Sequence, residues 1–135
     1  MKHSFIKYLV TVFLFTFTGL LFAQAKWVVF DESERMTYYI DSASIKKTNQ
    51  FARVWSLIQY KTPKQNGYFQ TKSVTSLEEY DCKEEKIHTL KQTLYSGDMG
   101  TGESYGIDLS NDKWSYITPS TISDYIKNFV CKKNK

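Results

Sequence analysis

Short apolar runs separated by polar or turn-forming residues dominate the chain from residue 26 to about residue 114. Runs rich in β-branched and aromatic residues, bounded by Gly, Pro, Asn, Asp or Ser, are typical of strands joined by turns. The predicted strands are residues 27–30, 36–40, 51–60, 68–80, 87–95 and 105–109, and residues 114–117 extend the sheet or run along it. Short polar side chains at 41–44 predict a turn. Residues 61–67, which contain Pro63 and Asn66-Gly67, predict a loop or hairpin end because Asn and Gly tolerate positive φ.

The predicted strand 51–60 is apolar on both faces. One face carries Phe51, Trp55 and Leu57, and the other carries Val54, Ile58 and Tyr60. A strand with this pattern is central in a sheet and at least partly covered on both sides. The predicted strand 68–80 mixes the two parities, which indicates a bulge or a two-sided environment.

Only the end of the chain has the periodicity of a helix. Its apolar residues recur at helical spacing: Ile122, Tyr125, Ile126, Phe129 and Val130. This stripe predicts a helix packed on the sheet, with Ser120 as its N-cap and Lys127 facing water. Phe129→Asp should therefore cost far more stability than Lys127→Asp. Cys131 falls about 180° from Ile122, so either the helix ends near Phe129 or the segment around Cys82 wraps around it.

The first 25 residues have a different composition from the rest. Two Lys and no acidic residue accompany an apolar run over 8–22, and Ala23 and Ala25 occupy positions −3 and −1 of a secretory cleavage site. A run of this length is short for a bilayer core, which takes ~20 residues. The sequence predicts a signal peptide over 1–25, a single domain over 26–135, and no transmembrane span in the mature protein.

Charge narrows the class of partner. The full chain has 18 basic and 14 acidic residues, and removal of residues 1–25 leaves 110 residues with a net charge of +2. Nucleic-acid-binding domains normally carry a concentrated basic stripe, so no nucleic-acid partner is predicted. The length is that of one domain, which excludes multidomain machinery.

The two cysteines, Cys82 and Cys131, both lie in the predicted exported part. Export and an even count favour one structural disulfide between them. A metal site has too few ligands at standard spacing, and a redox site lacks a local Cys-x-x-Cys pattern. Free thiols are the remaining alternative.

The sequence contains three weak candidates for chemistry. The glycine-rich segment 97–102 has the wrong glycine order for a dinucleotide loop and no helix after it, so it is interpreted as a turn. The acids around Cys82 alternate with lysines, which favours a solvated mixed-charge hairpin over a hydrolytic pair. His88 has no ordered triad around it. No enzyme activity, metal or cofactor is predicted, whereas outward-facing tyrosines suit protein recognition.

Several short segments recur in order in a known family. They are Trp27, Tyr38-Tyr39-Ile40-Asp41, Ser44-Ile45, Val54-Trp55, Glu79-Tyr80-Asp81-Cys82, Tyr95-Ser96, Met99-Gly100-x-Gly102, Trp114, Thr118-Pro119-Ser120 and Val130-Cys131. Together they resemble the surface-adhesin protein E family of Gram-negative bacteria. The resemblance covers nearly the whole predicted mature chain. The sequence departs from the family at Thr118-Pro119-Ser120-Thr121, where a Pro-Gly-Ser form is often seen.

The resemblance implies an α+β fold: an antiparallel sheet of about six strands with a C-terminal helix, tied by a bridge between Cys82 and Cys131. It also implies a non-enzymatic adhesin that binds host matrix or serum proteins such as vitronectin, laminin or plasminogen and can form a homodimer. The alternative is a soluble periplasmic accessory protein. Basic residues just after the first cysteine are the partner-binding candidates that it offers: Lys83, Lys86 and Lys91.

Overall fold

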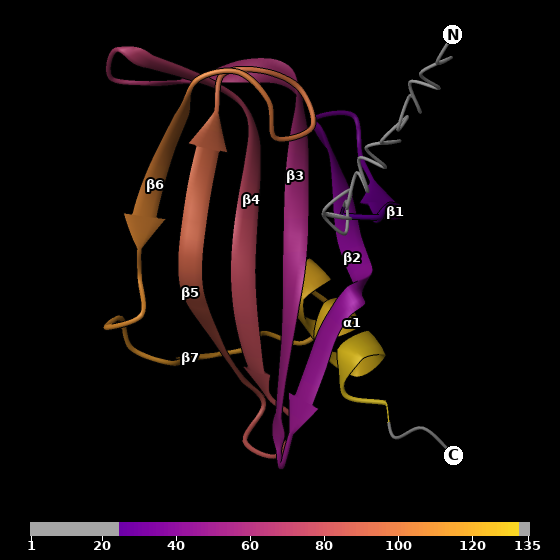
Figure 1. Ribbon diagram of the computed structural model, residues 1–135. Coiled ribbons are helices and arrows are strands. Elements are labelled where there is room, and N and C mark those ends of the chain that lie inside the picture. Colours follow the sequence, from indigo (N-terminus) through magenta and orange to yellow (C-terminus); the bar gives the residue numbers. More distant parts are fainter. Residues whose placement is uncertain (1–24, 133–135) are drawn as a thin grey trace, which may run out of the picture.

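The computed structural model describes residues 25–132, and most of the predicted signal peptide lies outside these residues. An antiparallel sheet with the strand order β1-β2-β3-β4-β5-β6 forms the body of the domain, and a single helix lies behind it in Figure 1. A further short strand, β7, pairs with β5 alongside the path of β6. The predicted α+β architecture is confirmed.

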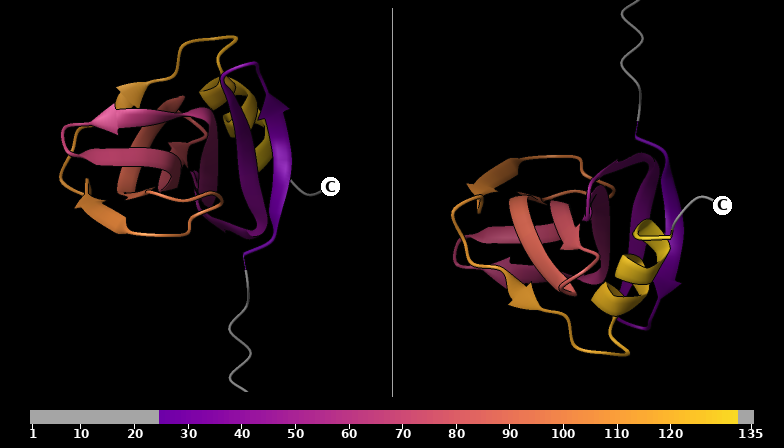
Figure 2. Two further views of the ribbon diagram at one scale, coloured as in Figure 1. Left: turned by 90° about the horizontal axis from the view of Figure 1, so that it is seen from above. Right: turned by 90° about the horizontal axis from the view of Figure 1, so that it is seen from below.

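Strands β1 to β6 follow one another as neighbours in space, so the connections among them are local antiparallel ones. Their bounds are β1 Trp27–Glu32, β2 Met36–Thr48, β3 Phe51–Asn66, β4 Phe69–Asp81, β5 Lys86–Tyr95, β6 Ser104–Asp108 and β7 Ser115–Tyr116. The helix α1 spans Ile122–Val130. The end-on views of Figure 2 show that the sheet curls, with α1 on one side and β1 and β6 at opposite ends.

The turn predicted at residues 41–44 is instead an irregularity inside the long strand β2. The register between β2 and β3 shifts between Asp41 and Lys46. The Asp41 side chain accepts a hydrogen bond from the Ala43 N–H at 3.1 Å, and the Ser44 hydroxyl accepts one from the Trp55 N–H at 2.9 Å. The short polar side chains therefore satisfy a bulge rather than end the strand. The loop predicted over residues 61–67 is mostly wrong, because β3 continues to Asn66 with a register shift between Gln59 and Lys64. Asn66-Gly67 does end the β3–β4 hairpin, with Gly67 at φ 60°.

The hydrophobic core lies between α1 and one face of the sheet. Its buried members are Ile40, Ala52, Val54, Tyr80, Ile126 and Val130. Cross-strand partners share a face in an antiparallel sheet. Trp55, the residue after Val54, therefore points to the opposite face, which α1 does not cover.

The helix docks through a different side than its apolar stripe predicts. Ile126 is 2% exposed and Val130 is buried, as expected, but Tyr125 is 55% and Phe129 41% exposed. Lys127, predicted to face water, is 8% exposed. At 100° per residue, the buried side is rotated by about a quarter of a turn from the stripe, toward Cys131.

Ion pairs explain how Lys127 is accommodated. Its Nζ lies 2.7 Å from the Glu85 carboxylate in the β4–β5 turn and 3.2 Å from the Asp124 carboxylate on the preceding turn of α1. The structure removes the reason to expect Phe129→Asp to cost far more stability than Lys127→Asp, because an aspartate at position 127 would be buried facing two carboxylates. Phe129 makes an edge contact with Phe30, their ring centroids 5.7 Å apart.

The disulfide accounts for the rotation of the helix. Cys82 and Cys131 are bonded, with their Cα atoms 5.7 Å apart, which confirms the predicted bridge. Cys131 directly follows the last helical residue and lies four residues after Lys127, so the bond draws this side of α1 onto the end of β4. The N-cap is Thr121 rather than the predicted Ser120, since the Thr121 side chain accepts from the Asp124 N–H.

Candidate functional site

The face of the sheet opposite α1, named here the open face, carries one continuous row of side chains across all six main strands. The paired residues are Trp27, Asp41, Trp55, Leu77, Lys91 and Asp108, from β1 to β6. Trp27, Trp55 and Leu77 are half-buried, and Lys91 is exposed. The row combines apolar side chains with charges of both signs on the face opposite α1, although Asp41 is only 8% exposed.

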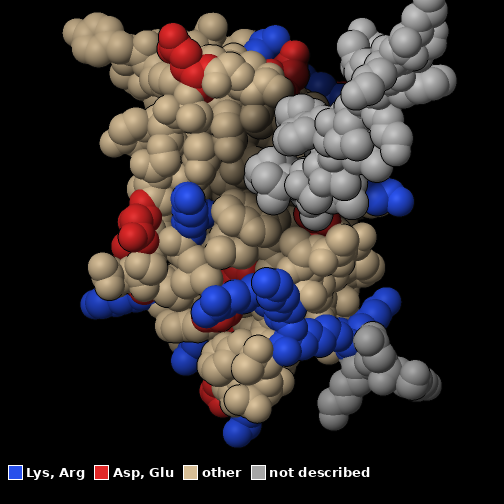
Figure 3. Space-filling view, in the orientation of Figure 1, with Lys and Arg blue, Asp and Glu red and all other residues tan. Residues whose placement is uncertain are grey.

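Two shallow hollows flank Trp55 on the open face and share Asp41 and Trp55 in their linings. One is bordered by Lys46 and Arg53 and the other by Trp27, Lys91 and Tyr95. Figure 3 shows this face, with few charged side chains across its middle and basic ones gathered at its lower end. Arg53 is paired with Glu79, and Lys46 is its direct neighbour across β2 and β3.

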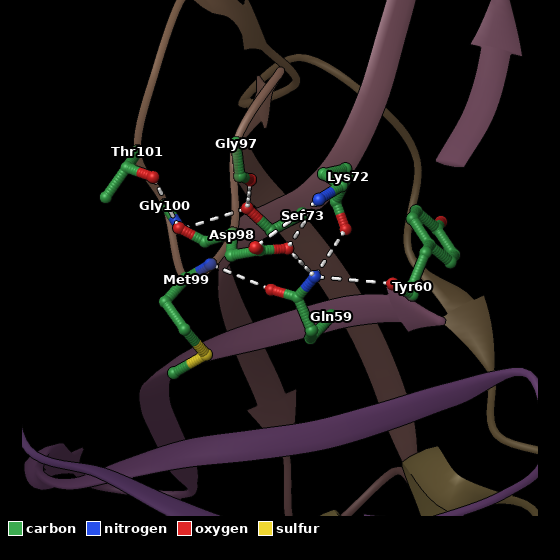
Figure 4. Close-up of polar contacts among 9 residues, drawn as sticks. All are labelled: Gln59, Tyr60, Lys72, Ser73, Gly97, Asp98, Met99, Gly100 and Thr101. Atoms are coloured by element: carbon green, nitrogen blue, oxygen red, sulfur yellow. Dashed lines mark hydrogen bonds and ion pairs between the residues drawn. The ribbon is translucent and has the colours of Figure 1, made fainter. Parts of the chain in front are cut away.

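The glycine-rich segment 97–102 is a turn, as predicted. It folds over the upper end of the open face (Figure 1). Figure 4 shows the two side chains that hold it, Ser73 and Gln59. The Ser73 hydroxyl donates to the Gly97 carbonyl at 2.7 Å and accepts from the Gly100 N–H at 2.9 Å. The Gln59 amide accepts from the Met99 N–H at 2.8 Å and donates to Asp98 at 2.8 Å.

This network rules out the phosphate-cradle interpretation of the segment. A phosphate loop needs several backbone N–H groups free to point at the anion. Here the N–H groups of Met99 and Gly100 are engaged by Gln59 and Ser73, and that of Gly97 donates to the Thr101 carbonyl at 2.9 Å. The segment is therefore a structural element that shapes the edge of the open face.

Two of the acids around Cys82, Glu78 and Asp81, are engaged by groups that hold the fold together. The Glu78 carboxylate accepts a hydrogen bond from the Tyr80 hydroxyl at 2.8 Å, on the same face as the helix. Burial raises the pKa of Glu78, and the hydrogen bonds from Tyr80 and Ser56 only partly oppose it. The predicted solvated hairpin is thus wrong for Glu78, whose carboxyl group is desolvated within the fold.

Asp81 organises the β4–β5 turn. One of its oxygens accepts from the backbone N–H groups of Lys83 and Glu84, at 3.0 and 2.9 Å, and both oxygens accept from the Gln50 amide. Desolvation disfavours the charged form of Asp81, but these hydrogen bonds outweigh it and lower the pKa of Asp81. Its carboxylate is a cap for the turn and not one member of an acid–base pair.

His88 is buried in the sheet and has a structural environment. Its Nε2 lies 3.1 Å from the Leu109 carbonyl oxygen, and its ring centroid is 5.1 Å from that of Trp114. These contacts fit the interpretation as an ordinary strand histidine. Within residues 25–132 no three His, Cys, Asp or Glu side chains are grouped to hold a metal ion.

The three candidate lysines come from one hairpin but lie in three places. Lys83 is exposed in the β4–β5 turn and borders a hollow at the disulfide end with Lys47 and Lys132. Lys86 begins β5, and its Nζ lies 4.8 Å from the ring centroid of Tyr116. Lys91 alone lies in the row across the open face.

Comparison with known proteins identifies the family. The family model described as surface-adhesin protein E matches residues 27–132 of the chain. The chain belongs to the surface-adhesin protein E family. The resemblance drawn from the short ordered segments is thereby confirmed, and the family implies an exported adhesin at the surface of a Gram-negative bacterium.

Solved structures share the fold of this family member. Crystal form II of Haemophilus influenzae protein E is 18% identical with a TM-score of 0.58, over 75% of this chain and 90% of that one. The selenomethionine form of Haemophilus influenzae protein E is 18% identical with a TM-score of 0.55, over 75% of this chain and 88% of that one. Protein E from non-typeable Haemophilus influenzae is 17% identical with a TM-score of 0.52, over 78% of this chain and 84% of that one. No curated protein matches the chain.

Sequence reasoning missed most of the open face. The pattern places Phe51, Trp55 and Leu57 on one side of a strand, but it does not say which side the helix covers. The signal that could have found the row is the pairing order of consecutive antiparallel strands, which aligns Trp27, Trp55 and Lys91. In the part of the chain that the structure describes, no helix is long and apolar enough to cross a membrane.

Proposed function

We propose that this protein is an exported, non-enzymatic adhesin-like module that binds a protein partner through its open face. The observation that carries the proposal is the row from Trp27 to Asp108, which combines aromatic and apolar side chains with charged ones. Aromatic residues and arginine are enriched at protein interfaces, where a few buried side chains supply most of the affinity. The partner is a host matrix or serum protein, or a protein of the bacterial envelope.

The structural engagement of the candidate catalytic groups supports a binding role over a chemical one. Glu78, Asp81 and His88 each contact a group that holds the fold together. A general base or nucleophile must instead reach a reacting atom of the substrate. Membership of an adhesin family points in the same direction.

Among the candidate lysines, Lys91 is the one that we assign to the partner interface on the open face. Its positive charge beside Trp55 and Leu77 would steer an acidic partner and set its orientation. Lys83 and Lys86 would contribute only if the partner extends to the disulfide end of the sheet. We further propose that residues 1–25 are removed on export, which N-terminal sequencing of the cellular protein tests.

A pull-down tests the interface. The protein is immobilised and exposed to host matrix, serum and envelope proteins, and Lys91→Glu is compared with Lys113→Glu, a charge reversal in the exposed loop after β6. The proposal expects Lys91→Glu to reduce recovery of the partner severalfold and Lys113→Glu to leave it unchanged. Equal recovery with both variants would remove the open face from the mechanism.

Labelling of intact cells distinguishes the proposed adhesin from the alternative, a soluble periplasmic accessory protein. A membrane-impermeant amine reagent should modify lysines of an adhesin exposed at the cell surface. Complete protection in intact cells, together with modification after the outer membrane is opened, would favour the periplasmic role.

A further inference from the structure

The sheet has two edges, and they differ in how well they are protected. β1 has a register irregularity between Val29 and Asp31 and ends in two acids, features that discourage another strand from pairing. β6 pairs with β5 over five consecutive residues without a register shift and contains neither proline nor lysine. Its other edge meets no strand among the described residues, so alternate backbone N–H and C=O groups remain available there.

An apolar groove lies beside this free edge. Its lining comes from the tip of the β3–β4 hairpin and from β5 and β6, mainly Tyr68, Phe69, Gln92, Leu94, Tyr105 and Ile107, and it contains no charged side chain. Tyr105 is 62% exposed. In Figure 2 the hairpin and β6 extend on the same side of the molecule. We name this feature the edge groove.

The edge groove is distinct from the open face. Gln92 pairs with Ile107 and Ser76, Ser76 with Ser56, and Ser56 with Ile40, which packs in the core under α1. Partners in such a chain share a face, so the groove lies on the helix side of the sheet. A strand added at β6 would therefore direct every second side chain into the groove.

Charge distinguishes the kinds of strand that can bind. Glu103 and Asp108 flank the two ends of β6, and both are exposed. Hydrogen bonds from Ser110 lower the pKa of Asp108. The positive charge of Lys91, which pairs with Asp108 on the neighbouring strand β5, lowers this pKa further. None of the ion pairs of residues 25–132 involves Glu103.

A second copy of this chain is disfavoured at the edge by the same charges. Two-fold pairing of β6 about Gly106 would set Ser104 opposite Asp108 of the other copy. Each end of the ribbon would then gather Glu103 of one copy and Asp108 of the other, on opposite faces of the sheet, and two negative charges at one end of a ribbon repel each other. A strand with a cation at each end would meet complementary charge instead.

We propose that the free edge of β6 and the edge groove bind an extended segment of a protein partner that has apolar residues at alternate positions and a basic residue at each end. The segment adds a seventh main strand by backbone hydrogen bonds, while its apolar side chains fill the groove. This inference rests on the proposed protein-binding function but uses a surface separate from the open face.

A synthetic peptide provides the test. The probe is fluorescent Lys-Val-Thr-Val-Thr-Val-Lys, blocked at both termini, and its binding to the purified protein is measured by anisotropy. Two further probes have the same sequence. One is N-methylated on the backbone at all three valines, and the other at both threonines. Since alternate amides of a strand point to opposite edges, one methylated probe should lose binding and the other should keep it. Equal binding of both would show adhesion without strand pairing and would overturn the proposal.

Protein variants locate the site. Tyr105→Ala should weaken binding of the parent peptide about tenfold, as loss of an aromatic contact at the centre of an interface does. Tyr125→Ala, which truncates a tyrosine of similar exposure on α1, should leave it unchanged. Glu103→Lys should also weaken binding, and Glu84→Lys in the β4–β5 turn should not. Indifference of the peptide to both Tyr105→Ala and Glu103→Lys would place the site elsewhere.

Sedimentation of the protein without peptide completes the experiment. The proposal expects no self-association that depends on the edge groove. A dimer that dissociates on Tyr105→Ala would show that a second copy occupies the groove and would overturn the proposal. The binding assay needs neither cells nor the natural partner, so its failure would leave the pull-down on the open face as an independent test.

Discussion

Truncation of Ile126 should cost much more stability than truncation of Tyr125, although tyrosine loses more atoms. Ile126 is 2% exposed and packs in the core cluster with Ile40, Val54 and Tyr80. Its replacement by alanine removes three buried carbons, each worth about 0.8 kcal/mol of transfer free energy. The cavity left behind brings the expected loss to about 3 kcal/mol.

Tyr125 lies on the same helix, one residue away, but is 55% exposed. Its truncation should cost less than about 1 kcal/mol, as changes at exposed positions usually do. Both substitutions introduce alanine into α1 and gain a similar, small amount of helix propensity, so this contribution nearly cancels in the comparison. The difference between the variants therefore reports which side of the helix is docked.

Urea denaturation of the two variants, followed by circular dichroism, measures the difference. Equal slopes with separated midpoints would confirm that only stability has changed. Ile126→Ala should also lower the melting temperature by about 10 °C or more, at about 4 °C per kcal/mol for a domain of this size. If Tyr125→Ala cost as much as Ile126→Ala, α1 would be docked through the stripe that the sequence predicts, and the rotation toward Cys131 would be refuted.

Three other predictions follow from the interactions inside the fold. Replacement of both Cys82 and Cys131 by serine should lower stability by up to about 4 kcal/mol, the chain-entropy value for their separation of 49 residues. Calorimetry under identical buffer conditions measures this loss, and an unchanged melting temperature would contradict the prediction. The pKa of Glu78 is raised in the folded state, so the folded protein binds the proton more tightly and this group's stabilising effect is lost as pH rises above the unfolded value near 4.5. Glu78→Gln should remove that decline, and denaturation midpoints that fall equally with pH in both proteins would refute the assignment. Ser73→Ala should speed hydrogen exchange at residues 97–101, because the buried hydroxyl bonds to the turn at both Gly97 and Gly100; the exchange in α1 serves as the internal control and should stay the same.

The order of the strands and the existence of one terminal helix could be predicted from the sequence for a local reason. Period-two runs of aromatic and β-branched residues, interrupted by turn formers, specify where each strand begins within a few residues, although β2 and β3 extend well past their predicted ends. Antiparallel neighbours joined by short turns then need no long-range information, as the β3–β4 hairpin at Asn66-Gly67 illustrates. The disulfide was accessible for the same kind of reason, since two cysteines in an exported chain have only each other.

The docking of the helix was beyond the sequence because two signals in it conflict. The apolar stripe centres on Ile122, Ile126 and Phe129, whereas the bond at Cys131 pulls the helix from another side. Only the folded chain brings Glu85 from the β4–β5 turn to Lys127. This ion pair allows a lysine to be buried on the side of α1 that faces the sheet. A stripe on a helical wheel contains no information about carboxylates 42 residues away in the chain.

The open face and the edge groove also depend partly on the sequence and partly on the folded structure. The sequence by itself determined which residues alternate along each strand, and so it placed Trp55 and Val54 on opposite faces. Which face stays open was decided only when α1 covered Val54, because both faces of β3 are apolar enough to be buried. The row from Trp27 to Asp108 arises from the register of the paired strands, and the edge groove from the position of the β3–β4 hairpin tip beside β5 and β6. Both surfaces bring together residues that are far apart in the sequence.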